Sequence, residues 1–170
     1  MDSLQASVRE YKKQMERGVV PKAYRGILDC VLQLKTHFKN RHPEYAVPGG
    51  WYQGYMDMTY FSLFPKALKK RKLKIAVVFL HGDCRFEVWL AGANKQVQRQ
   101  YWERIRESGW KKYRLAASVQ GNDSIIESVL AEDPDFDDPA ALTRRIESGV
   151  VRFIQDVERF VSAKGARSAG

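Results

Sequence analysis

Four polar residues near the middle of the chain have the types that could carry chemistry. Asp57 and Glu87 are carboxylates, and Lys74 and Arg85 are basic residues of the predicted strands beside them. Two carboxylates on one sheet face could hold Mg²⁺ or Mn²⁺ through oxygen, or act as an acid and base pair. The alternative is that both acids pair with nearby basic groups and fix the strand register. The sequence favours this alternative. If the site is instead catalytic, the candidate residues are Asp57, Glu87 and Lys74.

Aromatic residues fall on the same predicted face. Trp51, Tyr55 and Trp89, together with Arg85, could line a pocket for a ring-bearing ligand. Aromatic side chains more often pack against helices. The sequence leaves both interpretations open.

Other chemical motifs are absent from the sequence. It contains no Gly-x-Ser-x-Gly, no P-loop and no dinucleotide-binding glycine pattern. Cys30 and Cys84 fit no zinc spacing and are expected to be free thiols in a reducing cytoplasm. His37 and His42 fall near a helix C-terminus, where basic groups complement the helix dipole. We therefore expect no bound metal and no cofactor.

The chain is strongly basic, with a formal net charge of +9 and a pI near 9.6. Such a charge attracts polyanions, nucleic acid among them, and also promotes solubility. Nucleic-acid contacts of this kind would be weak, independent of sequence and sensitive to salt. The candidate phosphate-binding residues are Lys66, Lys69, Lys70, Arg71, Lys72 and Arg99.

A predicted hairpin organises these positions. Residues 73–80 are almost continuously apolar, as in a strand covered on both faces. The turn at residues 81–83 contains Gly82, which can take positive φ. In the following strand Phe86, Val88 and Leu90 point to one face and the alternate residues to the other. A third strand is predicted over residues 51–61, which would place Asp57 within it.

The remaining pattern predicts an α+β fold with a four- or five-stranded, mixed or mostly antiparallel sheet flanked by about four helices. Residues 1–163 are expected to form one domain, followed by a flexible tail at 164–170. The sequence shows no secretory leader and no apolar run of the ~20 residues that a membrane span needs. Helices are predicted at 2–17, 22–40, 95–108 and 139–163, and further strands at 110–117 and 124–131.

The sequence also resembles a small bacterial family of unknown function. The resemblance rests on residues 55–61, 73–79 and 85–95, with further similarity at 125–127 and 134–137. It spans most of residues 8–163. It implies a bacterial, cytosolic protein with a single domain, and it implies no activity.

The predicted order of helix, three-stranded meander, helix and strand is similar to the core of the restriction-endonuclease-like fold. Nucleases of that fold place an aspartate on the second core strand and an acidic-x-lysine triplet on the third, around a divalent metal. Glu87 matches the acidic position, but Trp89 replaces the lysine and residues 73–80 contain no acid. An active nuclease of this type is therefore not expected.

The sequence thus favours a cytoplasmic, non-catalytic binding module for a polyanion, such as nucleic acid, or for a small ligand. The alternative is a metal-dependent hydrolase that uses Asp57 and Glu87.

Overall fold

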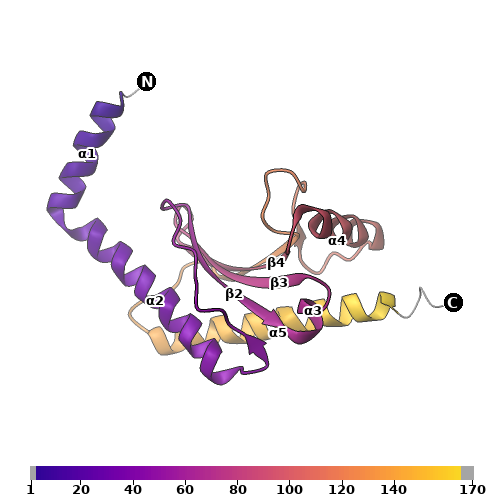
Figure 1. The fold of residues 1–170 in the computed structure, drawn as a ribbon. Coiled ribbons are helices and arrows are strands. Elements are labelled where there is room, and N and C mark those ends of the chain that lie inside the picture. The colour runs from indigo at the N-terminus through magenta and orange to yellow at the C-terminus, as the bar shows by residue number, and fades with distance from the viewer. Residues whose placement is uncertain (1–2, 166–170) are drawn as a thin grey trace.

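The computed structural model describes residues 3–165, which form helices packed on an antiparallel sheet (Figure 1). None of the helices in this range is long and apolar enough to cross a membrane. The elements are α1 (Leu4–Arg17), α2 (Val19–Arg41), β1 (Tyr45–Ala46), β2 (Met58–Pro65), α3 (Lys66–Lys69), β3 (Leu73–Leu80), β4 (Arg85–Gly92), α4 (Lys95–Ser108), β5 (Arg114–Leu115), β6 (Ile126–Ala131) and α5 (Pro139–Gly165).

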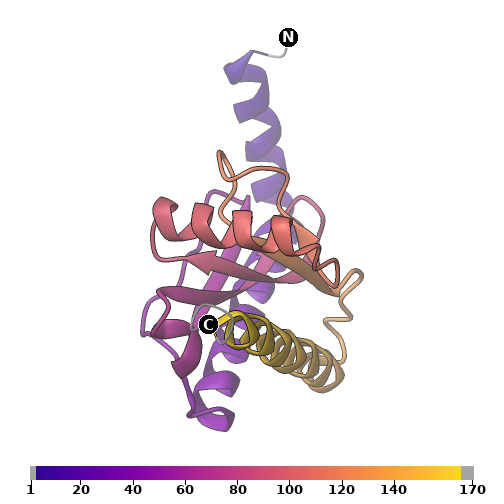
Figure 2. The same cartoon turned by 90° about the vertical axis from the view of Figure 1, so that its right-hand side faces the viewer.

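The strands are arranged in the order β1-β2-β3-β4-β6-β5, and every neighbouring pair is antiparallel. Helices α2 and α5 cover one face of this sheet (Figure 1), where Phe61, Val77 and Val88 are buried with residues of both helices. Helix α4 lies at the end of the sheet where β4 finishes (Figure 2). We call the face opposite α2 and α5 the open face.

The predicted hairpin is confirmed as β3 and β4. Strand β3 is central and pairs with β2 and β4 along its length, and its apolar side chains are buried on both faces. Phe86, Val88 and Leu90 point into the core, as their alternation predicts. The residue of the turn with positive φ is Cys84 (φ 49°) and not Gly82.

The α+β class is confirmed, but the sheet has six strands and the described residues form five helices. The strand predicted at 51–61 is wrong in its bounds, because β2 begins at Met58. Gly54 and Met56 have positive φ, at 72° and 64°, which breaks an extended strand before Asp57. Only an isolated bridge between Tyr52 and Tyr60 precedes it.

Other boundaries also differ from the prediction. Helix α2 begins at Val19 and not at residue 22, and β6 begins at Ile126 and not at residue 124. The strand expected at 110–117 shrinks to β5, because Trp110 leaves the sheet to stack on Phe160 at 4.5 Å. Helix α5 reaches Gly165, two residues into the predicted tail. The rest of that tail, residues 166–170, lies outside the described part of the chain.

A cluster of histidines and carboxylates joins α2 to α5. His42 Nε2 lies 2.6 Å from Glu147 Oε1, and His37 Nε2 lies 3.0 Å from Glu147 Oε2. His42 Nδ1 contacts Glu44 at 3.0 Å, and its ring stacks on Tyr45. The two histidines thus bind a carboxylate of another helix, a tertiary contact that the helix-dipole interpretation missed.

Burial by itself lowers the pKa of His42, but the hydrogen bonds to Glu147 and Glu44 raise it overall. Burial raises the pKa of Glu147, but the hydrogen bonds from His42 and His37 lower it overall. A raised His pKa stabilises the fold below the unfolded value of about 6.5 and loses that contribution as pH rises. A lowered Glu pKa stabilises it above about 4.5. The cluster therefore contributes most between these values.

Replacing Glu147 by Gln is expected to lower the free energy of unfolding more at pH 5.5 than at pH 8.5, since the stabilisation that comes from the raised His42 pKa is lost as pH rises. Urea unfolding at the two pH values measures the difference. The matched control is Glu107→Gln on the exposed side of α4, which should change neither value. An equal loss at both pH values would show that protonated His42 does not contribute.

Gly92 sets the approach of α4 to the end of β4. A Cβ atom at Gly92 would lie 2.7 Å from the backbone N of Gln98, whereas one at Gly82 would contact nothing within 4 Å. Gly92→Ala should therefore cost about 1–3 kcal/mol of unfolding free energy, the usual range for overpacking. Gly82→Ala should change it by less than about 0.5 kcal/mol. Thermal or urea unfolding of the two variants tests this, and similar values would contradict it.

Candidate binding site on the open face of the sheet

A hollow of about 360 Å³ lies on the open face, between the sheet and the first turn of α4. Strands β2, β3 and β4 form its floor, and two loops form its sides. The lining residues include Tyr52, Met58, Tyr60, Lys74, Ala76, Trp89, Ala91, Asn94, Lys95, Gln98 and Asp123.

Aromatic rings line the floor and one side. The Tyr52 ring stacks on the Tyr60 ring at 5.1 Å, and Trp89 comes from β4 on the same face. Ala76 also faces the hollow, and it pairs with Ser62 of β2 and with Trp89 of β4. Its small side chain leaves the space that a larger residue would fill.

Two lysines give the hollow its positive charge. Lys74 Nζ lies 5.7 Å from the centroid of the Tyr60 ring, and within residues 3–163 no carboxylate forms an ion pair with it. Lys95 Nζ donates to the carbonyl of Asn122 at 3.0 Å. Lys95 is also the first residue of α4, where the helix dipole favours anions. Asp123 also lines the hollow, so the two lysines leave a net positive charge there, which suits a negatively charged group.

Gln98 holds the side of the hollow in place. This side chain is 4% exposed. Its Nε2 donates to the carbonyls of Asn122 (3.1 Å) and Ser124 (3.2 Å), and its Oε1 accepts from the backbone N–H of Gly92 (3.2 Å). One amide thus ties α4, the end of β4 and the loop before β6 together.

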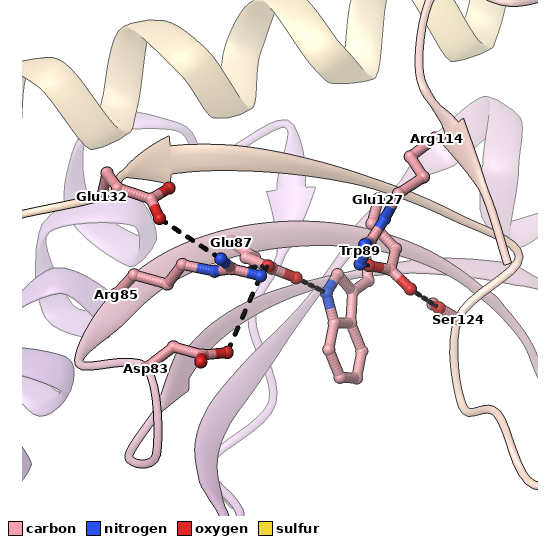
Figure 3. Close-up of polar contacts among 8 residues, drawn as sticks. All are labelled: Asp83, Arg85, Glu87, Trp89, Arg114, Ser124, Glu127 and Glu132. Carbon is pink, nitrogen blue, oxygen red and sulfur yellow. Dashed lines mark hydrogen bonds and ion pairs between the residues drawn. The ribbon is translucent and has the colours of Figure 1, made fainter.

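Glu87 orients Trp89 from the neighbouring part of β4 (Figure 3). Glu87 Oε1 accepts from Arg85 Nε at 2.8 Å and lies 2.6 Å from Arg85 Nη2. Its Oε2 accepts from Trp89 Nε1 at 2.6 Å. Glu87 is 1% exposed, so both oxygens are engaged and shielded from water. Such a carboxylate positions its neighbours and is poorly placed to exchange protons with a substrate.

Asp57 lies elsewhere. It occupies the turn before β2, where its Oδ1 accepts from the Tyr55 backbone N–H at 2.8 Å. Hydrogen bonds from the backbone of Met58 and Tyr55 lower its pKa. Strand β3 separates β2 from β4, and Glu87 is level with Tyr60, three residues beyond Asp57. The described residues contain no group of three or more His, Cys, Asp or Glu side chains that could hold a metal.

The structure distributes the sequence-predicted pocket residues widely. Trp89 lines the hollow, and so does Lys74, which the sequence offers as a catalytic candidate. Trp51 instead packs against the core, Tyr55 is 93% exposed, and Arg85 is bound to Glu87.

The basic segment, which consists of Lys66, Lys69, Lys70, Arg71 and Lys72, adjoins one end of the hollow. Its residues belong to α3 and the turn that follows, and the Lys72 carbonyl accepts from the Ala93 backbone N–H at 2.8 Å, just before α4. Arg99 is on the outer side of α4, which it shares with the basic residues Lys95 and Arg104 and with the acids Glu103 and Glu107. The positive surface is therefore interrupted by acids there.

Comparison with known proteins places the chain in a family. A family described as a domain of unknown function, DUF7000, matches residues 4–161. The chain belongs to this family. No curated protein and no solved structure matches the chain. The family match confirms the resemblance to a family of unknown function and assigns no activity to the hollow.

Sequence reasoning missed Tyr52, Tyr60, Gln98 and Asp123 as lining residues. The neighbours of Tyr60 depend on the register of β2 against β3. A usable signal was present in the outward positions of the hairpin. Small residues there, beside large aromatic ones, indicate a hollow in a sheet surface, and Ala76 and Ala91 are such residues.

Replacing Glu87 by Gln is expected to lower the free energy of unfolding by about 1–3 kcal/mol, because one donor of Arg85 or Trp89 loses its acceptor in a buried site. Urea unfolding followed by tryptophan fluorescence measures the loss. The control is Glu132→Gln, which alters an exposed carboxylate that also contacts Arg85. Equal effects of the two variants would contradict the role given to Glu87.

Proposed function

We propose that this protein is a non-catalytic binding module for a small ligand that carries an aromatic ring and an anionic group. One observation carries the proposal: Lys74, with no carboxylate partner among the described residues, borders a hollow lined by Tyr52, Tyr60 and Trp89. A ring stacked on these side chains would place an attached carboxylate or phosphate near Lys74 and Lys95.

The size of the hollow favours a small molecule over a polymer. Its volume of about 360 Å³ is near the lower end of the range for ligand pockets, roughly 300–1,000 Å³. The basic segment at residues 66–72 would raise the local concentration of anions. Because acids interrupt the basic surface at Arg99, we favour a small anion over nucleic acid.

The surroundings of the acids support binding without catalysis. Glu87 is fully engaged by Arg85 and Trp89, and Asp57 is engaged by backbone N–H groups on the far side of β3. Neither carboxylate faces the other across a common substrate position. We also propose a reducing, cytoplasmic location, which the free thiols of Cys30 and Cys84 support.

The test compares anions with neutral analogues. Isothermal titration would measure binding of indole-3-acetate, benzoate and AMP against indole-3-acetamide, benzamide and adenosine, respectively. We expect at least one anion to bind about tenfold more tightly than its neutral analogue, a difference of about 1.4 kcal/mol. Lys74→Gln should abolish that preference, whereas Lys69→Gln, on the exposed side of α3, should preserve it.

Two results would overturn the proposal. The first is that no member of the panel binds at millimolar concentration. The second is that single-stranded DNA binds and depends on residues 66–72 while Lys74→Gln has no effect, since this would make the basic segment the site.

A further inference from the structure

Helix α1 carries an apolar stripe that no other part of the described chain covers. The stripe consists of Leu4, Val8, Tyr11 and Met15, whose exposed fractions are 80%, 48%, 61% and 42%. No described residue of α1 is buried. In Figure 1 the helix extends away from the sheet and from α5.

Local interactions stabilise α1 only modestly. Ser3 Oγ accepts from the Ala6 backbone N–H at its start, and Gly18 ends it at φ 75°. The exposed pair Lys12–Glu16, 3.8 Å apart, contributes a few tenths of a kcal/mol. A helix of 14 residues is marginal in water without tertiary packing. The stripe therefore indicates a packing partner.

The spacing of the stripe is that of a helix–helix seam. Its four residues are separated by four, three and four positions, as in the apolar positions of a coiled coil. The positions that flank the seam carry few charges, so two such helices would bring no like charges together. These flanking residues are Gln5 and Lys12 on one side and Ser7 and Gln14 on the other.

We propose that α1 packs against α1 of a second copy of this chain, as an antiparallel, two-fold symmetric dimer. Leu4 and Met15 are equally far from the midpoint of the stripe, and so are Val8 and Tyr11. Antiparallel pairing therefore packs Leu4 of each copy on Met15 of the other, and Val8 on Tyr11. Every contact occurs twice, as an isologous interface requires.

The bend between α1 and α2 extends this surface. It encloses an open hollow of about 1,030 Å³, whose apolar lining includes Val20, Tyr24 and Leu28. Met15 belongs to both the stripe and this lining. In the antiparallel dimer, Leu4 of the second copy lies on Met15 and so reaches the apolar wall of the hollow. The stripe and the hollow thus accept one occupant together.

The expected affinity is modest. A helix of this length is about 20 Å long, and a seam of that size buries less than the roughly 800 Å² per partner of a standard interface. We therefore expect a dissociation constant in the micromolar range, with dimers at high protein concentration and monomers after dilution.

Sedimentation equilibrium from about 1 to 500 µM tests the dimer. The double variant Val8→Ser/Tyr11→Ser should shift the dissociation constant upward by at least tenfold. Its control, Arg9→Ser/Lys13→Ser, makes two similar changes on the other side of α1 and should leave the constant within about threefold. Tryptophan fluorescence checks that both variants keep the fold, since every Trp lies outside α1. A monomer at 500 µM, with or without affinity for lipid vesicles, would overturn the proposal, and so would equal effects of the two variants.

Disulfide formation tests the orientation. In a background with Cys84→Ser, chains with Val8→Cys and chains with Tyr11→Cys are oxidised separately and as a mixture. The antiparallel dimer should give cross-linked dimers mainly in the mixture, because each position faces the other. Cross-linking of Tyr11→Cys by itself, equal to that of the mixture, would indicate a parallel pair and overturn the arrangement.

Discussion

The pairing of β3 with both β2 and β4 is the constraint on which the rest of this structure depends. Strand β3 is buried on both faces, and a shift by one residue would exchange its core and open faces. The register brings Lys74 of β3, Trp89 of β4 and Tyr60 of β2 to the open face. The hollow is thus a consequence of strand register, and α4 completes it at the end of β4.

Polar contacts then make this face specific. Glu87 uses both carboxylate oxygens to hold Arg85 and Trp89, and Gln98 joins α4 to the loop before β6. Both side chains are nearly inaccessible to water. A polar group in such a buried position is costly when it lacks a hydrogen-bond partner. They favour one arrangement of the aromatic rings, and preorganised rings lose little entropy when a ligand binds. Lys74 forms no ion pair with a carboxylate among the described residues.

Much of the fold could be predicted from local pattern. The hairpin and the helices α1, α2, α4 and α5 follow from periodicity and from caps such as Asn94, which accepts from the Val97 backbone N–H. The segment before β2 could not be predicted in this way. Its aromatic residues suit a strand, but positive φ at Gly54 and Met56 and the contacts of Asp57 delay the start of the strand to Met58. The strand predicted at 110–117 was too long for a similar reason, since Trp110 lies outside β5 and stacks on Phe160 of α5.

The sequence by itself determined the α+β class, the central hairpin with its inward and outward residues, and the positive charge, because each follows from local periodicity or composition. Only the tertiary structure decided which polar residues meet. It separated Asp57 from Glu87 by a strand, paired His37 and His42 with Glu147 of α5, and gathered Tyr52, Tyr60, Lys74 and Trp89 around one hollow. The physical reason is that these contacts join elements far apart in the chain, so they depend on strand register and helix packing, which local sequence pattern does not specify.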